Sequence, residues 1–261
     1  SGSVPSSLLY WVVSDTLYAY QQIALLHRSN LNLPVVAITG SVGKTTTREL
    51  IRAILSPLGN IVSTRENENN DIGVPKTLLR CSSKDSVIVL EMGMRGIGQI
   101  ERLSHCSEPD VAVITNIGHA HLGLLGSRDN IARAKSEITS NLKPDGVLII
   151  PFGDDLLEKA LKLKWSGRII RVAIDDYSLE WLGANDNYFA SKDTKPDYIA
   201  QIDIKNNLII LNGNKFLLPL EGRHNEMNYL MALAVANELG VAISNLNKLD
   251  LKIPLGRNRL I

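Results

Sequence analysis

The sequence predicts an α/β protein of the P-loop type, with a mostly parallel sheet flanked by helices and a small antiparallel β segment. Three observations support this prediction. Short runs rich in Val and Ile alternate with helical stretches, as expected for parallel strands that are covered on both faces. A glycine-rich turn, GSVGKT, joins an early strand to a helix. Towards the C-terminus, alternating residues interrupted by Asn-Asn and Asn-Gly indicate antiparallel hairpins.

Composition limits the possible partners. The chain has 261 residues, of which 44% are hydrophobic and 5% aromatic, so an aliphatic core between helices and a sheet is expected. The net charge of +1 gives no electrostatic reason to expect nucleic acid or an anionic membrane as a partner. No apolar stretch approaches the roughly 20 residues of a membrane span. Cys81 and Cys106 are interpreted as reduced thiols of a cytoplasmic protein.

The predicted elements follow one another closely along the first two thirds of the chain. A lead-in helix over 14–28 begins behind a Ser-Asp pair, and no signal peptide is expected because the N-terminus lacks a basic region and a cleavage site. A strand at 35–39 and a helix from 43 towards 57 enclose the glycine-rich turn. Further strands are predicted at 86–93, 110–118, 146–151 and 168–174, and further helices at 72–81, 97–105, 129–142 and 154–164.

The pattern changes at about residue 180. Residues 197–220, DYIAQIDIKNNLIILNGNKFLLPL, alternate in the way that hairpin strands do. A helix over 225–239 follows and is expected to stop at Gly240. We therefore divide the chain into a linker with its lead-in helix, 1–30, and one α/β domain, 31–261, with an appended β segment.

Residues 39–47, TGSVGKTTT, are the strongest functional signal. In such a loop several backbone N–H groups point at one phosphate, the lysine reaches the outer phosphates and the Thr hydroxyl holds magnesium. Ile38 stands where the usual pattern has glycine, so the loop is a shortened variant. A plain strand–turn–helix with a chance match is the alternative, but the strand before it and the long helix after it favour nucleotide binding. The candidate nucleotide-binding residues are Gly40, Ser41, Val42, Gly43, Lys44, Thr45 and Thr46.

Four further polar residues are candidates from their positions. Glu91 ends an apolar run and precedes a glycine, so it is a candidate magnesium ligand, although a carboxylate there can also cap a helix. His119 and His121 are two residues apart and share one face of an extended segment, where a surface histidine is the common alternative. Lys135 lies among small residues on a predicted helix, and its spacing alone indicates only a solvated salt-bridge partner.

Several segments in this order resemble the central ATP-binding domain of the Mur ligases. They are AITGSVGKTTT, ENENNDIGVPKTLL, LEMGMRGIGQI, TNIGHAHLGLLGSRDNIARAKSEI, GRHNEMNYLMALAVANELG and the terminal PLGRNRL. The resemblance extends from about residue 14 to 261. The shortened loop also occurs in folylpolyglutamate and cyanophycin synthetases, whereas NENNDIGVP and AHLG…AKSEI resemble the member that adds D-alanyl-D-alanine to UDP-N-acetylmuramoyl-tripeptide in peptidoglycan synthesis.

The resemblance implies ATP and Mg²⁺ as cofactors and an acyl-phosphate mechanism. ATP would phosphorylate the carboxylate of the muramoyl-tripeptide, the amine of D-alanyl-D-alanine would attack, and phosphate would leave. Phosphorylation converts a poor acyl donor into one with a good leaving group, and the step depends on charge neutralisation and alignment. The resemblance also implies a cytoplasmic enzyme of cell-wall synthesis, which we expect to be a monomer.

The resemblance assigns metal ligands and catalytic residues. It implies that Thr45 and Glu91 hold the first magnesium and that His121, not His119, is the second metal ligand. Lys135 matches a lysine that the family carbamylates, which turns an ammonium into an anionic group able to bind magnesium. The implied catalytic residues are Lys44, His121, Lys135 and Arg257.

Other positions match contacts to the substrates. Asn225 matches a nucleotide contact, Arg257 matches an arginine that reaches the ATP phosphates, and Asn69 and Asn70 match a loop that faces the muropeptide. The chain departs from the family at Glu66-Asn67, where Gly-Asn is frequent, and at a glycine, position 123, where glutamate is common. Both departures lie on the substrate side, so they bear on the substrate more than on ATP.

Three hypotheses follow for the function. The first is the D-alanyl-D-alanine ligase, and the second is a ligase of the same superfamily for another carboxylate, such as a folate or an aspartate polymer. The third is a nucleotide-binding switch, which is expected to carry a base-recognition motif such as Asn-Lys-x-Asp; the sequence contains one stretch of this form, NKLD at 247–250, near its C-terminus. Because related enzymes carry a uridine-binding domain before this part and another domain after it, we expect the chain to be a central domain without its two neighbours, inactive alone.

Overall fold

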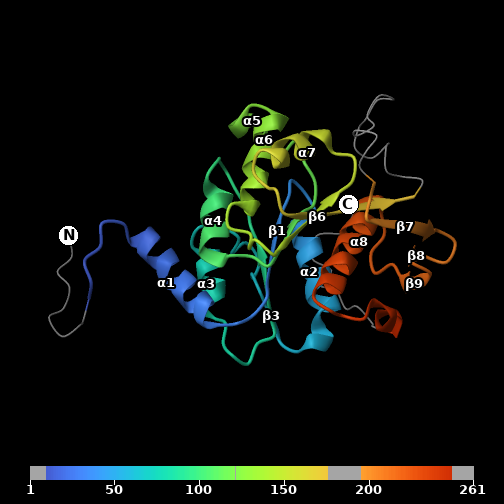
Figure 1. Ribbon diagram of the computed structural model, residues 1–261, viewed down its shortest axis with the longest axis horizontal. Coiled ribbons are helices and arrows are strands. Elements are labelled where there is room, and N and C mark those ends of the chain that lie inside the picture. The colour runs from blue at the N-terminus through green and yellow to red at the C-terminus, as the bar shows by residue number, and fades with distance from the viewer. Residues whose placement is uncertain (1–9, 121, 176–194, 249–261) are drawn as a thin grey trace.

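The predicted fold class is confirmed. The computed structural model describes residues 10–120, 122–175 and 195–248. Within these residues, nine strands form a single sheet in the order β2-β3-β1-β4-β5-β6-β7-β8-β9. Helices lie on both sides of this sheet, as Figure 1 shows.

The centre of the sheet is parallel and wholly buried. All residues of β1 (Val35–Thr39), β3 (Val87–Glu91), β4 (Val111–Ile114) and β5 (Val147–Pro151) are inaccessible to solvent or nearly so. Apart from the terminal Thr39 and Glu91, each strand is therefore an unbroken apolar run instead of an alternating one, because both faces are covered. The parallel pairing continues to β6 (Arg168–Ile174).

Two layers of helices bury the two faces. The side chains of Val36 and Ile38 pack with α2 (Lys44–Ile54) and α8 (Arg223–Glu238), whereas those of Val35 and Ala37 pack towards the opposite layer. That opposite layer consists of α1 (Thr16–Asn30), α3 (Gly73–Leu79), α4 (Gln99–Ser107), α6 (Arg128–Ser136) and α7 (Asp155–Lys162). The contact between α2 and α8 matters for the site, because it sets α8 beside the helix that follows the glycine loop.

The predicted hairpins continue the main sheet. β7 (Tyr198–Asp203) pairs with β8 (Leu208–Leu211), and β8 with β9 (Asn214–Leu217), both antiparallel. β7 also pairs in parallel with β6, so that these strands extend the parallel sheet instead of forming a separate layer. The turn between β8 and β9 uses Asn212 and Gly213 with positive φ angles of 50° and 77°, as the Asn-Gly signal predicts.

The structure differs from the predicted elements in a few places. The edge strand β2 (Ile61–Ser63) was not predicted, because three half-buried residues give no periodic pattern. A four-residue helix, α5 (Leu122–Leu125), was also not predicted. The strand predicted at 110–118 ends at Ile114, and the helix predicted at 129–142 ends at Ser136 and continues as a 3₁₀ turn, Glu137–Thr139. Similarly, α2 is followed by a separate 3₁₀ turn, Ser56–Leu58.

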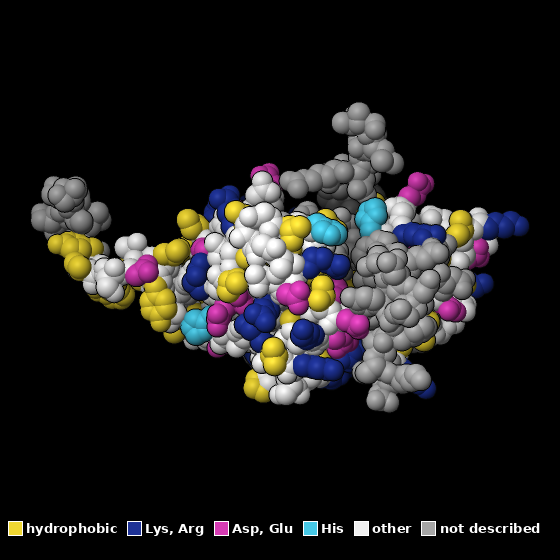
Figure 2. Space-filling model, turned by 90° about the horizontal axis from the view of Figure 1, so that it is seen from above, with side chains coloured by type: hydrophobic (Ala, Val, Ile, Leu, Met, Phe, Trp, Pro, Cys, Tyr) yellow, Lys and Arg dark blue, Asp and Glu magenta, His cyan; other side chains and the backbone are white. Residues whose placement is uncertain are grey.

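Exposed apolar side chains are most concentrated on the N-terminal segment. In the view from above, yellow hydrophobic groups gather on the projecting segment at the left, whereas charged, polar and His side chains mix over the visible central surface (Figure 2). Trp11 and Val12 are the most exposed, at 91% and 88%. No helix within 10–120, 122–175 and 195–248 has the length and hydropathy needed to cross a membrane.

Candidate functional site

The glycine loop adopts a backbone that its glycines make possible. Gly40 and Gly43 have φ angles of 152° and 83°. A Cβ atom on Gly40 would lie 1.8 Å from Oγ1 of Thr115, and one on Gly43 would lie 2.8 Å from Oδ1 of Asn228. Both glycines are therefore required by close packing as well as by conformation.

The loop is held by the segment that follows β4. The backbone N–H of Ser41 donates to the carbonyl of Asn116 at 3.1 Å, and that of Val42 donates to Oδ1 of Asn116 at 3.1 Å. The carbonyl of Val42 accepts from Nδ2 of Asn116 and from Oγ1 of Thr115, and Oγ of Ser41 accepts from the N–H of Gly118. This role of Thr115 and Asn116 was not predicted from the sequence. The available signal was that both are polar and directly follow the buried strand.

Backbone N–H groups in the first turn of α2, at the end of the glycine loop, have no acceptor within the helix. The first hydrogen bond of the helix runs from the N–H of Thr47 to the carbonyl of Gly43 at 2.8 Å, and the N–H groups before it lack intrahelical acceptors, as at every helix start. Nζ of Lys44 folds back and donates to the carbonyl of Gly40 at 2.8 Å. Burial lowers the pKa of Lys44, and the charge of Glu91 opposes this shift. This arrangement can bind an anion at the helix N-terminus.

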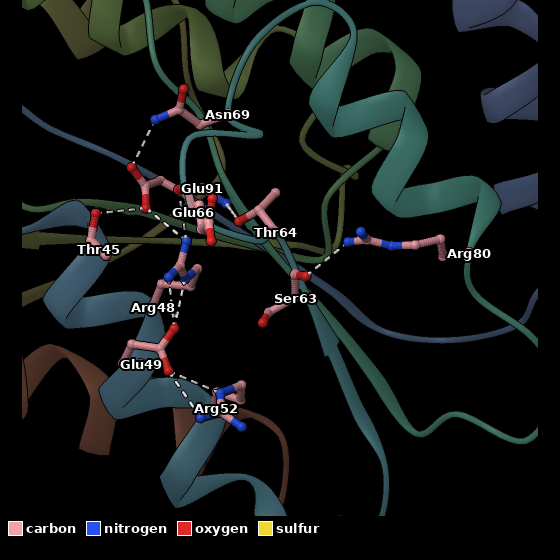
Figure 3. Close-up of polar contacts among 10 residues, drawn as sticks. All are labelled: Thr45, Arg48, Glu49, Arg52, Ser63, Thr64, Glu66, Asn69, Arg80 and Glu91. Carbon is pink, nitrogen blue, oxygen red and sulfur yellow. Dashed lines mark hydrogen bonds and ion pairs between the residues drawn. The ribbon is translucent and has the colours of Figure 1, made fainter. Parts of the chain in front are cut away.

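Glu91 lies where β3 ends, 2% exposed, and accepts hydrogen bonds from three side chains (Figure 3). Its Oε2 accepts from Oγ1 of Thr45 at 2.9 Å and from Nη1 of Arg48 at 3.2 Å, and its Oε1 accepts from Nδ2 of Asn69 at 2.9 Å. Its backbone N–H donates to Oγ1 of Thr64. The structure thus brings the two predicted ligands of the first magnesium together.

Arg48 connects Glu91 to a line of charges along α2. Its guanidinium is buried and also donates to Oε1 of Glu49, from Nε at 3.1 Å and from Nη2 at 2.7 Å. Oε2 of Glu49 then accepts from Arg52 at 3.0 Å. The role of Arg48 was not predicted from the sequence, because an arginine on a helix gives no signal of burial until the neighbouring strands are known.

The two predicted substrate residues differ in what they contact. Asn69 donates to Glu91, whereas Oδ1 of Asn70 accepts from the N–H groups of Ile72 and Gly73 at 3.1 and 2.9 Å. The side chain of Asn70 therefore stabilises the start of α3. Their proposed contact with the muropeptide stays a prediction.

Lys135 is buried, with 1% of its surface exposed. Burial lowers its pKa to about 7, and the positive charge of Lys44 acts in the same direction. No ion pair to Lys135 occurs in the part of the chain that the structure describes. The expectation from spacing alone, a solvated salt-bridge partner, is therefore wrong, because the helix face that carries Lys135 is covered. A buried amine that is neutral near pH 7 can react with CO₂.

Asn225 lies near the start of α8 and is 2% exposed. Its Nδ2 donates to the carbonyl of Glu221 at 2.7 Å, while its buried Oδ1 has no partner among the described residues. One turn further on, Nδ2 of Asn228 is also buried without such a partner, and this side chain lies against Gly43. Unsatisfied polar atoms beside the loop are consistent with a polar ligand there.

The remaining predicted positions are His119, His121 and Arg257. His121 and Arg257 lie outside the described residues, and their roles stay predictions. His119 is described and is exposed to solvent.

The donor set at the loop fits magnesium. Oγ1 of Thr45 and the carboxylate of Glu91 are hard oxygen ligands, set 2.9 Å apart at the start of α2. The described residues contain no group of three or more His, Cys, Asp and Glu side chains able to hold a metal ion. The protein would thus supply two ligands, and phosphate oxygens and water the others, as magnesium prefers.

A pocket of about 660 Å³ lies beside β2. Arg48, Glu49 and Arg52 of α2 form one part of its lining, and Ser63, Thr64 and Arg80 are among the others. Arg48, the partner of Glu91, therefore borders open volume.

Comparison with known families assigns the chain to one family. The family described as the Mur ligase middle domain matches residues 38–236, which is most of the chain. This match includes the glycine loop, Glu91, Lys135 and Asn225.

Individual relatives agree. The chain is 42% identical over 250 residues to a UDP-N-acetylmuramoyl-tripeptide–D-alanyl-D-alanine ligase of Synechocystis sp., covering 95% of this chain and 50% of that protein. It is 38% identical over 231 residues to the ligase of the same name from Bacillus subtilis, covering 88% and 47%. A crystal structure of MurF from Acinetobacter baumannii superposes with a TM-score of 0.79 at 34% identity, covering 96% and 52%. The chain thus spans about half the length of these proteins.

Proposed function

Because this chain belongs to the Mur ligase family, we propose that it is the ATP-binding part of an enzyme that joins D-alanyl-D-alanine to UDP-N-acetylmuramoyl-tripeptide in peptidoglycan synthesis. The names of the Synechocystis and Bacillus relatives, at 42% and 38% identity, support this substrate pair. The whole activity belongs to a protein of about twice this length, whose other parts would supply the remaining substrate contacts. We expect it in the cytoplasm, where ATP is available.

The observation that carries the proposal is the hydrogen bond between Thr45 and Glu91 at the end of the glycine loop. It joins a hydroxyl of α2 to a carboxylate of β3 at 2.9 Å, in the place where a loop-bound triphosphate would present its outer phosphates. A nucleotide bound there with magnesium would have its transferable phosphoryl group at the carboxyl edge of the sheet, where ligands of α/β proteins bind.

The residues have separate tasks in the proposed reaction. The free N–H groups of the first turn of α2 and Lys44 would hold the phosphates, Thr45 and Glu91 would hold magnesium, and Asn225 would contact the nucleotide. Bound magnesium supplies charge neutralisation on the phosphates and polarises the group that is transferred. The substrate carboxylate attacks phosphorus, the bond to ADP breaks, and the acyl phosphate then loses phosphate when the amine attacks its carbonyl carbon.

Phosphate release by the full-length enzyme tests the proposal. ATP, Mg²⁺ and UDP-N-acetylmuramoyl-tripeptide would be supplied with D-alanyl-D-alanine, and in parallel with a folate plus glutamate and an aspartate polymer plus arginine. We expect phosphate release and a new amide only with the first pair. Amide formation with either of the other pairs instead would show a superfamily ligase for another carboxylate. Nucleotide exchange without formation of any amide would show a switch.

A further inference from the structure

Arg48 is buried between two carboxylates that belong to different parts of the structure. Glu91 lies at the end of β3 and Glu49 on α2, and the guanidinium donates to both of them. The side chain of Arg48 is only 6% exposed, and that of Glu91 only 3%. A buried carboxylate without a counter-charge is strongly unfavourable, so Arg48 compensates Glu91 when no metal is bound.

One carboxylate oxygen of Glu91 contacts Arg48 and is also the oxygen proposed to bind magnesium. Oε2 accepts from both Thr45 and Arg48, and it is the oxygen nearest to the proposed magnesium ligand Oγ1 of Thr45. A magnesium ion on this oxygen would add two positive charges beside a guanidinium 3.2 Å away. Arg48 and magnesium therefore compete for Glu91.

Glu49 is a second hydrogen-bond acceptor for the guanidinium of Arg48. It already accepts two hydrogen bonds from Arg48, at 2.7 and 3.1 Å, both shorter than the 3.2 Å contact to Glu91. Figure 3 shows Arg48 between the two carboxylates, and the pocket of about 660 Å³ that both Arg48 and Glu49 line leaves room for the guanidinium to withdraw. Arg48 can then leave Glu91 without losing its ion pair.

We propose that Arg48 is a positioning residue that pairs with Glu91 in the absence of metal and moves fully to Glu49 when magnesium binds, and so sets the magnesium affinity of the site. This inference rests on the proposed function, because it requires Glu91 to be a magnesium ligand. It assigns Glu49, which is not among the proposed ligands of nucleotide or metal, an indirect part in metal binding.

Two variants should shift the magnesium affinity in opposite directions. Arg48→Met removes the competitor, so the Mg²⁺ concentration at which ADP binding is half-maximal should fall about tenfold. Glu49→Gln leaves Glu91 as the charged partner of Arg48 among the described residues and removes a negative charge, so the same midpoint should rise about threefold. Calorimetric titration of the full-length protein with ADP, at a series of Mg²⁺ concentrations and in one buffer, measures both shifts.

Thermal unfolding gives a second measurement that a purely structural role would not explain. Arg48→Met should lower the melting temperature in EDTA, because Glu91 loses its counter-charge, and Mg²⁺ with ADP should restore most of the loss. The matched control is Arg52→Met. Arg52 also forms an ion pair with Glu49, but its side chain is 40% exposed. Its magnesium midpoint should change less than twofold.

The outcomes separate this inference from the proposed function. Wild-type protein whose ADP binding does not depend on Mg²⁺ would contradict the function itself. A magnesium-dependent wild type with unshifted midpoints in Arg48→Met and Glu49→Gln, or with both shifted in one direction, would overturn only the role of Arg48. If Arg48→Met does not fold in either condition, the rise expected for Glu49→Gln decides alone.

Discussion

Lys135 and Lys44 are electrostatically coupled: burial is the main reason that the pKa of Lys135 falls to about 7, and the positive charge of Lys44 lowers it further. The pKa of Lys44 is lowered as well, by its own burial. Two amines with weakened affinity for protons therefore lie in the region where the phosphates are proposed to bind.

The first prediction concerns stability and pH. The unfolded chain keeps Lys135 protonated up to the ordinary lysine pKa of 10.5, whereas the folded chain releases the proton near 7. Between these values the unfolded state binds more protons, so the free energy of unfolding contributed by Lys135 increases with pH, by up to about 1.4 kcal/mol per pH unit. Lys135→Met removes this dependence, so the variant should be the more stable protein near pH 7, with an advantage that shrinks towards about pH 10.

Denaturant unfolding in EDTA buffers free of bicarbonate measures this difference. The control is Lys162→Met, which replaces an exposed lysine on α7. Parallel pH profiles for wild type and Lys135→Met would show that Lys135 keeps an ordinary pKa in the folded protein.

The second prediction tests carbamylation of Lys135. The neutral amine adds to the carbon of CO₂, a proton is released to water, and the product is an anionic carbamate able to bind or orient magnesium. Lys135→Ala should lose most ligase activity in the full-length enzyme, and acetate or formate should restore part of it by occupying the vacated space. Lys135→Arg fills that space with a cation and should not respond to either acid. Full activity of Lys135→Ala without added acid would rule the carbamate out.

The third prediction concerns the lysine of the glycine loop. Nζ of Lys44 rests on the carbonyl of Gly40 at 2.8 Å, close to where the outer phosphates would bind. Lys44→Ala should reduce the rate of ATP-dependent phosphoryl transfer by an amount equivalent to about 3 kcal/mol or more. Lys76→Ala, which removes an exposed partner of Glu68, is the control and should keep its rate. Phosphate release assays on both variants measure these rates. A rate for Lys44→Ala equal to that of Lys76→Ala would contradict the phosphate-binding role of Lys44.

The fourth prediction separates metal binding from folding at Glu91. Glu91→Gln preserves the shape and an oxygen for Thr45 and Arg48 but removes the charge that attracts magnesium. The Mg²⁺ concentration for half-maximal activity should rise at least about tenfold, while the melting temperature changes little, because Arg48 keeps its pair with Glu49. Magnesium titration of the activity, with exposed Glu101→Gln as the control, gives the answer. An unchanged magnesium requirement in Glu91→Gln would show that Glu91 is a structural residue and not a magnesium ligand.

The fifth prediction tests the close packing of the loop against β4. Gly40→Ala would place a methyl group 1.8 Å from Oγ1 of Thr115 on a backbone with φ of 152°. We expect a loss of stability of at least about 2 kcal/mol in denaturant unfolding, from the clash and the backbone strain together. In the Gly40→Ala/Thr115→Ala double variant the clash is relieved, so the two losses should not be additive. Strict additivity would show that the loop moves away from Thr115 at little cost.

The sequence predicted well those parts whose cause is local. The buried strands are visible as unbroken Val and Ile runs, the glycine loop as a strand–glycine–helix pattern, and Glu91 as the acid that ends an apolar run. β2 was missed because it owes its strand conformation to pairing with β3 and not to its own three residues. The membership of β7 in the main sheet was missed for the same reason, since its parallel pairing with β6 joins residues far apart in the chain.

By itself, the sequence determined the fold class, the phosphate loop and, through its resemblance to the Mur ligases, the identity of Lys135 as a residue of interest. Only the tertiary structure decided the protonation and partners of the charged groups. Spacing on a helix predicted a solvated Lys135, whereas α6 buries it near Lys44 and lowers its pKa. In the same way, Arg48 becomes the counter-ion of Glu91 only because β3 ends beside α2. Periodicity and loop motifs act over a few neighbouring residues, while desolvation and Coulomb interactions depend on which distant segments surround a charge.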